Sequence, residues 1–178
     1  MIDKESQRNK LIELAGRHSS SQIDTYKDSI FLPYISLTNV KGKGAMMEEF
    51  FEWYLNELGI DTVLLKSNEN YDFLVRNKIK VELKVASIGM NNKVAFNQIH
   101  FGKDKDIDKF LFVIIKPDDN IDMFVVGKEE FTSGKIKVKK QHGDNKVTCA
   151  RIFGSYTHIV EELRDYEVNV DTIGSRLL

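Results

Sequence analysis

This chain of 178 residues contains little cysteine and little proline, and neither positive nor negative charge is in clear excess. The single cysteine, Cys149, excludes an internal disulfide framework and a cysteine-rich zinc site. Its surroundings, VTCARIF, predict a small core residue rather than a catalytic thiol. The 26 basic and 27 acidic residues nearly balance. Any contact with nucleic acid must therefore come from local basic patches rather than from the overall charge.

Long apolar runs are also absent. No stretch approaches the ~18 apolar residues of a membrane span, and the charged N-terminus contains no apolar core of signal-peptide length. We therefore expect a soluble, cytoplasmic protein without a membrane partner. The hydrophobic fraction of 42% is enough for a core, and the length fits a single domain over residues 1–178.

The most informative stretch is Tyr71–Ala86, with the sequence YDFLVRNKIKVELKVA. Apolar and polar residues alternate on both sides of a short polar turn, which is typical of two half-buried strands in a hairpin. A turn centred on Asn77 places Phe73 opposite Val81 and continues the apolar match on one face. Directly opposed side chains lie about 4.5–5.5 Å apart at Cβ.

The same register brings two carboxylates and a lysine together on the other face. Asp72 lies opposite Glu82, and Lys84 follows two residues along the strand. A slip by one residue would move Asp72 to the opposite face from Glu82. Two neighbouring carboxylates repel unless a cation joins them, and Mg²⁺ is typically held by one or two carboxylates plus substrate phosphate oxygens. Such an ion orients a phosphate and lowers the pKa of a bound water, which Lys84 is placed to hold or deprotonate.

Two motifs in this region resemble those of the PD-(D/E)xK nuclease superfamily. Asp72 is followed after nine residues by Glu82-Leu83-Lys84, although Tyr71 stands where the proline of the motif is expected. Upstream, KGAMME (residues 43–48) resembles the Lys-Gly-x-x-x-Glu helix start of several branches, including archaeal Holliday-junction resolvases. The resemblance covers roughly residues 43–115. It implies an α/β, restriction-endonuclease-like fold, with a mixed central β-sheet flanked by helices.

The resemblance also implies roles for individual residues. Asp72 and Glu82 would bind Mg²⁺, with the main-chain carbonyl of Leu83 as a third candidate ligand, and Lys84 would position or activate the attacking water. Glu48 would orient the water shell of the metal or hold a second ion.

A glutamine aimed at the site often follows the acid-x-Lys strand in restriction-type members of the superfamily. Gln98 is the candidate for this position, with Asn97 as its neighbour and competitor.

By the same resemblance, the chain is expected to be a Mg²⁺-dependent DNA endonuclease in which Mn²⁺ can substitute. It would cleave double-stranded DNA to leave a 5′-phosphate and a 3′-hydroxyl. Small size and the FNQI segment favour a type II restriction enzyme acting as a homodimer. The other arrangement is the cleavage subunit of a heterodimeric type IIS or nicking system, paired with a larger recognition subunit. The alternatives are a Holliday-junction resolvase-type nuclease and a non-catalytic DNA-binding subunit of the same fold.

Each of these residues also has a plainer explanation. Glu82 and Lys84 would form a weak ion pair on a solvent-facing strand, and Glu48 would complement the helix dipole in a first turn. Asp118 and Asp119 are rival metal ligands, but the turn sequence PDDN explains them more simply.

Two further segments are candidates for DNA contact. The polar loop that includes Asn91, Asn92 and Lys93 suits contacts with phosphates or bases, and is otherwise a connecting loop. Farther along, the segment GKIKVKK is expected to form a strand, Gly134–Lys140, with a basic outer face. Its lysines would contact phosphate or blunt an exposed sheet edge; they are Lys135, Lys137, Lys139 and Lys140.

The chain is expected to have three parts: an N-terminal helical extension (1–42), a catalytic core (43–127) and a C-terminal hairpin and helix (128–178). Helices are predicted at 1–16, from Ser21 to about residue 30, at 45–58 and at 155–165, with Pro33 interrupting the N-terminal part. Strands are predicted at Thr62–Leu65, Phe110–Ile115 and Ile121–Val126, in addition to the hairpin. The continuously apolar strand Phe110–Ile115 is expected at the centre, covered on both faces.

Overall fold

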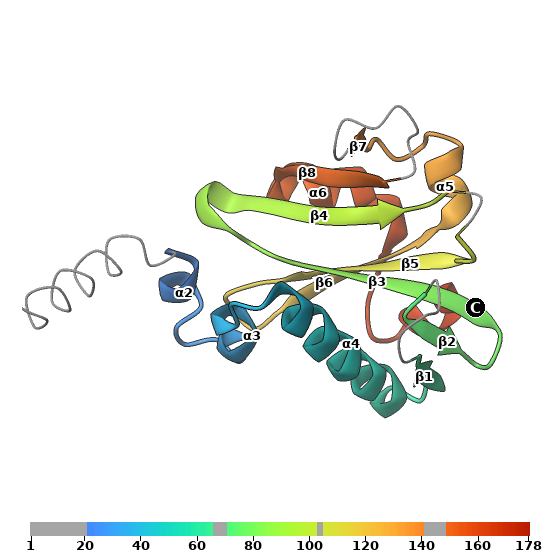
Figure 1. The fold of residues 1–178 in the computed structure, drawn as a ribbon, viewed down its shortest axis with the longest axis horizontal. Coiled ribbons are helices and arrows are strands. Elements are labelled where there is room, and N and C mark those ends of the chain that lie inside the picture. The colour runs from blue at the N-terminus through green and yellow to red at the C-terminus, as the bar shows by residue number, and fades with distance from the viewer. Residues whose placement is uncertain (1–20, 66–70, 103–104, 141–148) are drawn as a thin grey trace, which may run out of the picture.

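A six-stranded sheet forms the middle layer of the computed structural model, which describes residues 21–65, 71–102, 105–140 and 149–178 (Figure 1). The strands are β1 (Thr62–Leu64), β2 (Phe73–Val75), β3 (Ile79–Ser87), β5 (Lys109–Ile115), β6 (Ile121–Gly127) and β9 (Glu167–Val168). Their order is β1-β2-β3-β5-β6-β9. Only β3 and β5 are parallel; the other neighbours are antiparallel.

A second, three-stranded sheet covers one face of the first and was not predicted. It contains β4 (Lys93–His100), β8 (Cys149–Ser155) and β7 (Lys139–Lys140), in the order β4-β8-β7. The parallel pair β3–β5 requires a crossover, which is usually a helix. Here β4 lies in the crossover, and it pairs with β8 from the far end of the chain.

Some of the helices lie on one face of the larger sheet, and the smaller sheet lies on the other face together with the remaining helices. The helices are α2 (Ser21–Thr25), α3 (Leu32–Ser36), α4 (Val40–Glu57), α5 (Lys128–Thr132), α6 (Tyr156–Leu163) and α7 (Ile173–Leu177), with short 3₁₀ turns at Met90–Asn92 and Arg164–Tyr166. One core joins α3, α4 and α7 to the larger sheet. The other core joins the smaller sheet, α5 and α6 to the opposite face. The protein is therefore mixed α/β, with mostly antiparallel sheets.

Strand β5 lies between the two cores, as its apolar sequence predicted. Leu111 and Val113 pack toward α4, whereas Phe110 and Phe112 pack toward the smaller sheet. All four side chains are fully buried. The antiparallel neighbour predicted at Ile121–Val126 is also confirmed, as β6.

The predicted hairpin is confirmed, and so is its register from Phe73 to Val75. Phe73 pairs with Val81, and Val75 pairs with Ile79, around a turn in which Asn77 has a φ of 53°. Positive φ is uncommon for residues other than glycine, although asparagine tolerates it better than most. The turn chemistry and the apolar alternation therefore specify the same pairing. The predicted pairing of Asp72 with Glu82 is wrong, because Asp72 N bonds Val81 O and the Asp72 side chain accepts from Leu83 N.

Helix α4 confirms the predicted apolar stripe but begins five residues before the predicted start. The side chain of Asn39 caps it by accepting a hydrogen bond from Lys41 N at 3.1 Å, which satisfies one of the free N–H groups of the first turn. The predicted stripe is buried or packs against the core, through Met47, Phe50, Phe51, Tyr54, Leu55 and Leu58. Trp53 lies off the stripe and is 57% exposed.

Several local predictions were wrong. The helix expected from Ser21 to about residue 30 ends at Thr25, and Pro33 lies in the first turn of α3 rather than interrupting a helix. Proline suits that position because a first-turn N–H has no partner within the helix. Cys149 is partly exposed rather than buried in the core.

The strand predicted at Gly134–Lys140 is reduced to the two residues of β7. The preceding segment instead folds against α5, where Lys135 forms an ion pair with Glu130 at 2.9 Å. The predicted helix at 1–16 and the polar loop at 66–70 lie outside the described residues, as does the predicted turn around residues 142–145. In the described part of the chain, no helix is both long enough and apolar enough to cross a membrane.

Candidate functional site

The short strand β2 leaves half of β3 without a neighbour on one side. β2 pairs only with Ile79–Val81, whereas β3 continues to Ser87. From Glu82 onward, no described strand pairs with the edge of β3 that faces away from β5. The ribbon view shows this part of β3 between α4 on one side and β4 on the other (Figure 1).

Asp72 occupies the start of this open edge. Its backbone N–H still donates to Val81 O at 3.0 Å, and its carboxylate Oδ2 accepts a hydrogen bond from Leu83 N at 2.8 Å. The Asp72 carboxylate thus takes the place of a backbone carbonyl of a neighbouring strand, which would otherwise accept the hydrogen bond from Leu83 N. Because the N–H and C=O of one strand residue point to the same side, the carbonyl of Leu83 faces the same edge.

Glu82 and Lys84 lie on the face of β3 opposite to Val81 and Leu83, as their alternation predicted. Val81 and Leu83 are buried in the core with α4. Lys84 Nζ donates to Glu82 Oε1 at 2.6 Å, and the two side chains are only 18% and 15% exposed. This pair is therefore more shielded from water than an ordinary surface ion pair, which is worth little.

Glu48 and Gln98 reach the same site from opposite sides of β3. Glu48 is on α4, with its Oε1 folded back over Gly44, one turn earlier. Gln98 is on β4 at a register irregularity between Phe96 and Ile99, and has a φ of 54°. Such bulges redirect a side chain away from the regular alternation of the strand. Gln98 rather than Asn97 consequently borders the site.

Asp72, Lys84, Glu48 and Gln98 line a pocket of about 310 Å³, and Glu82 adjoins it through its ion pair with Lys84. Its walls come from α3, α4, β3 and β4, and they are Tyr34, Val40, Lys43, Gly44, Met47, Glu48, Asp72, Leu83, Lys84, Val85 and Gln98. Lys43, which belongs to the KGAMME segment, donates to Ile35 O at 3.1 Å and lies over the ring of Tyr34. Nothing in the sequence indicated that Tyr34 would be here, because α3 reaches the site only through tertiary packing.

The carboxylates in this site carry more negative charge than their surroundings compensate. Burial, followed by the charge of Glu82, raises the pKa of Asp72 to about 7, although the hydrogen bond from Leu83 opposes this. Burial also raises the pKa of Glu48, and Glu82 adds to the effect. Lys84 acts in the opposite direction on both groups. The pocket would therefore be stabilised by additional positive charge.

This donor set suits a hard divalent cation such as Mg²⁺. Asp72 and Glu82 provide carboxylate oxygens, and Leu83 provides a carbonyl at the same edge. Across the described residues, no three His, Cys, Asp or Glu side chains form a closed metal-binding group. Mg²⁺ does not require one, since it is usually held by one or two carboxylates while waters and substrate phosphates complete its coordination.

The other predicted residues lie elsewhere. Asp118 and Asp119 form the β5–β6 turn, where Asp118 Oδ1 accepts from Asn120 N and Asp119 Oδ1 accepts from Ile30 N. The turn interpretation therefore explains both. Asn91 and Asn92 form the β3–β4 turn with positive φ values of 57° and 56°, and neither lines the carboxylate pocket.

A larger hollow of about 590 Å³ lies near the other end of β3, at the β2–β3 turn. It is lined by Lys78, Lys109 and Lys128 together with Asp108 and Glu129. The described lining residues of this hollow carry charges of both signs and include neither Asp72 nor Glu82, so the chemically distinctive site is the smaller pocket.

A comparison of the sequence with protein-family models and with curated proteins finds no match.

Proposed function

We propose that this protein is a Mg²⁺-dependent DNA endonuclease with a restriction-endonuclease-like core. The single observation that carries the proposal is the convergence of Asp72, Glu82 and Lys84 with Glu48 at the open edge of β3. Asp72 of the hairpin, Glu48 of α4 and the shielded Lys84 line the same pocket, and Glu82 is joined to it by its ion pair with Lys84. This is the arrangement that the motif resemblance implies.

The topology supports the proposed fold to a limited extent. An antiparallel hairpin, a parallel strand pair and an antiparallel neighbour form a mixed sheet with α4 on one face. The smaller sheet on the other face, where the resemblance leads one to expect helices, is a departure.

In this proposal, Asp72 and Glu82 would hold Mg²⁺ together with the Leu83 carbonyl, and Mn²⁺ would substitute for it. When bound there, such an ion would supply charge stabilisation at a phosphate and a lowered pKa for a coordinated water. Asp72 is held in place for this role by the hydrogen bond from Leu83 N. Binding of a cation would also relieve the repulsion that raises the pKa of Asp72.

Lys84 positions the attacking water and offsets charge at the phosphate. Water attacks phosphorus, the bond from phosphorus to the 3′-oxygen breaks, and the products carry a 5′-phosphate and a 3′-hydroxyl. Glu48 orients water on the α4 side of the pocket, and Gln98 contacts the substrate from the β4 side. Each of these side chains except Glu82 lines the pocket directly.

The proposed substrate is double-stranded DNA, cleaved by a homodimer or by this chain together with a larger recognition subunit. Substitution of Lys84 by alanine tests the proposal, because a catalytic site should lose cleavage and keep DNA binding. Retained cleavage in that variant would overturn the assignment.

A further inference from the structure

The outer face of the smaller sheet carries an exposed phenylalanine ring surrounded by cations. Phe153 on β8 is 39% exposed. Lys93 on β4, Lys139 on β7 and Arg151 on β8 lie over its ring, with charge-to-centroid distances of 6.0, 5.9 and 5.6 Å. We call these four residues the aromatic–basic patch.

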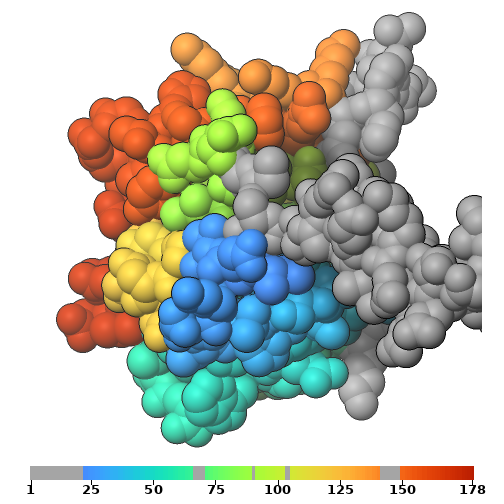
Figure 2. Space-filling model, turned by 90° about the vertical axis from the view of Figure 1, so that its left-hand side faces the viewer, coloured from blue at the N-terminus to red at the C-terminus, as the bar shows by residue number. Residues whose placement is uncertain are grey.

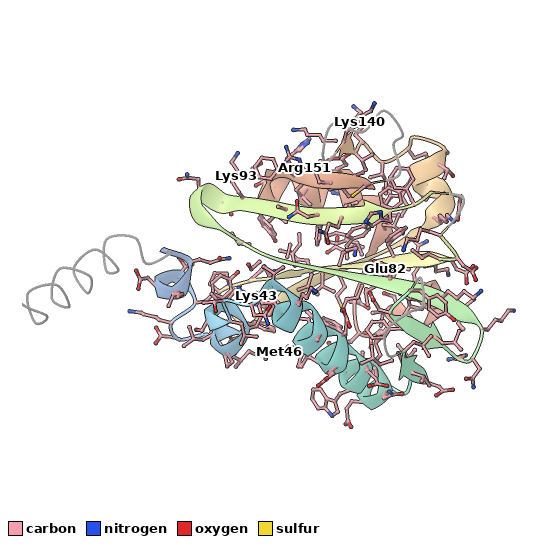
Figure 3. All side chains as sticks on the ribbon, viewed as in Figure 1. Lys43, Met46, Glu82, Lys93, Lys140 and Arg151 are labelled. Atoms are coloured by element: carbon pink, nitrogen blue, oxygen red, sulfur yellow. The ribbon has the colours of Figure 1, made fainter. Side chains whose placement is uncertain are left out.

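Sheet geometry explains why these side chains meet. On β8, Ala150 and Ile152 are buried in the core beneath the sheet, so Arg151 and Phe153 point outward. Lys139 is paired directly with Arg151, and Ala95 is paired with Phe153. Because alanine is small, Ala95 leaves room beside the ring, which Lys93 of the same strand approaches. In Figure 3, the labelled Lys93 and Arg151 lie on the side of the smaller sheet that faces away from the larger one.

The patch borders a pocket of about 330 Å³ with an excess of positive charge. Lys137 and His158 also line it, and among the lining residues that the structure describes Glu162 is the one carboxylate. Glu162 already accepts a hydrogen bond from Lys137 N at 2.9 Å. Four lysine and arginine side chains against one engaged carboxylate favour an anionic ligand.

A path of three neighbouring pockets with shared lining residues leads from this patch to the carboxylate site. A third pocket, of about 320 Å³, lies along the β3–β4 turn between them. It shares Tyr34 and Val85 with the carboxylate pocket and Lys93 with the patch pocket. Figure 2 shows the end of the molecule where α2 and α3 (blue) lie below the β3–β4 turn (yellow-green).

We propose that this path binds a single-stranded DNA segment next to the scissile phosphate, an inference that rests on the proposed nuclease function. One unpaired base stacks on Phe153, and its flanking phosphates contact Lys93, Lys139 and Arg151. Aromatic side chains bind single strands because unstacked bases expose their faces, whereas duplex bases are already stacked on one another. The preferred substrate then has a single-stranded extension or branch rather than two blunt ends.

Binding in EDTA tests this without cleavage. Fluorescence anisotropy would compare a labelled single-stranded oligonucleotide, the matching blunt duplex and the same duplex with a single-stranded extension. The wild type is expected to prefer the extended duplex, and Phe153→Ala is expected to weaken that binding about tenfold, which corresponds to the stacking of one base. Phe153→Tyr should retain it.

The salt dependence of binding tests the proposed phosphate contacts separately. Replacing Lys139 and Arg151 together by glutamine should reduce the slope of log affinity against log salt by about 1.4 for the single strand, or about 0.7 for each phosphate that is no longer neutralised. Trp53→Ala and Lys78→Gln are matched controls, since they remove an exposed aromatic ring and an exposed lysine elsewhere. Both controls should bind as the wild type does.

Equal binding of blunt and extended duplexes by the wild type, or unchanged binding by Phe153→Ala, would overturn the inference. Cleavage distinguishes it from the proposed function. Mg²⁺-dependent cleavage with no effect of Phe153→Ala on either binding or cleavage would support the nuclease function and contradict the role of the aromatic–basic patch. Patch-dependent binding with no cleavage of any of the three DNAs would contradict the nuclease function and support a single-strand binding surface.

Discussion

Lys84 is the residue on which the proposed chemistry most depends. It is largely shielded and is held beside Glu82 at 2.6 Å, within a pocket that contains two further carboxylates. A lysine serving only to balance Glu82 would have the same contact. A measurement of activity therefore distinguishes a catalytic Lys84 from a Lys84 that only balances the charge of Glu82, because the geometry is the same for both.

Replacement of Lys84 by alanine is expected to reduce the rate of DNA cleavage at least about 100-fold, the usual scale for loss of a proton-transferring group. DNA binding measured in EDTA should change little. Lys80→Ala is the matched control, because Lys80 lies on the same face of β3 but pairs with Asp106. Equal loss of cleavage in both variants would indicate a general effect of the strand's charge.

Asp72 should make the metal-free protein less stable as the pH rises. An aspartate in an unfolded chain has a pKa of about 3.9, whereas the folded value is about 7. The folded protein thus binds this proton more tightly, and the resulting stability is present below about pH 4 and lost as the pH rises through 7. This difference in pKa of about three corresponds to about 4 kcal/mol at pH 8, or roughly 8–16 °C in Tm.

Thermal unfolding of wild type and Asp72→Asn in EDTA measures this effect. The variant should gain stability relative to the wild type between pH 5 and pH 8, because an amide carries no charge to bury. Mg²⁺ should raise the Tm of the wild type above pH 7 and leave the variant nearly unchanged. A constant difference between the two proteins over this range would contradict the assigned shift.

At the scale of elements, the alternation of side chains made the hairpin and its register from Phe73 to Val75 predictable. Phe73–Val81 pairing follows from local pattern alone, and so does the central position of β5. The start of α4 was misplaced because Gly42 and Gly44 are poor helix formers, whereas capping by Asn39 and tertiary packing extend the helix through them.

Pairing between distant segments was not predictable in the same way. Strand β4 pairs with β8 across roughly fifty to sixty residues of sequence, and nothing in either strand specifies its partner. Gln98 was identified by resemblance, but the bulge that turns it toward the pocket was not. The alternation of Ala150 and Ile152 with Arg151 and Phe153 was the available signal for the aromatic–basic patch, and it was missed.

The buried hydroxyl of Tyr26 connects the segment of α2 and α3 to the larger sheet, and its contribution to stability can be measured. Its hydroxyl donates to Ile115 O at 2.6 Å and accepts from Ile88 N at 3.0 Å, in a fully buried position. Burial raises its pKa to about 12. Tyr26→Phe leaves both backbone groups without this partner and should reduce the free energy of unfolding by about 1–3 kcal/mol.

Urea unfolding is the appropriate measurement for this variant. Tyr166→Phe serves as its control, since the Tyr166 hydroxyl bonds the side chain of Glu130 in a partly exposed position. The control should lose no more than about 0.5 kcal/mol. A similar loss in both variants would mean that Tyr26 does not fix the N-terminal elements through its hydroxyl.

At the scale of the whole molecule, an aromatic cluster holds the two sheets together. Phe112 of β5 meets Phe96 of β4 at a centroid distance of 4.9 Å, and Phe131 of α5 at 5.9 Å. All three are buried. The open edge of β3 lies between α4 and β4, so the position of β4 on this cluster also sets the width of the pocket.

Phe112→Ala is therefore expected to cost about 3–5 kcal/mol of unfolding free energy, the usual range for a buried phenylalanine. Phe153→Ala, which removes a ring on the outer face, should cost about 1 kcal/mol or less. Chemical denaturation of both variants tests the contrast. A small loss for Phe112→Ala would show that the sheets are not joined through this cluster.

The central claim is that the edge of β3 is a metal-dependent nuclease site. Its most direct test is incubation of plasmid and genomic DNA with the wild type in Mg²⁺, the wild type in EDTA and Lys84→Ala in Mg²⁺, followed by gel electrophoresis. We predict discrete products in the first reaction alone. Absence of Mg²⁺-dependent cleavage by the wild type on linear, extended and branched DNA, or cleavage by Lys84→Ala at the wild-type rate, would contradict the claim.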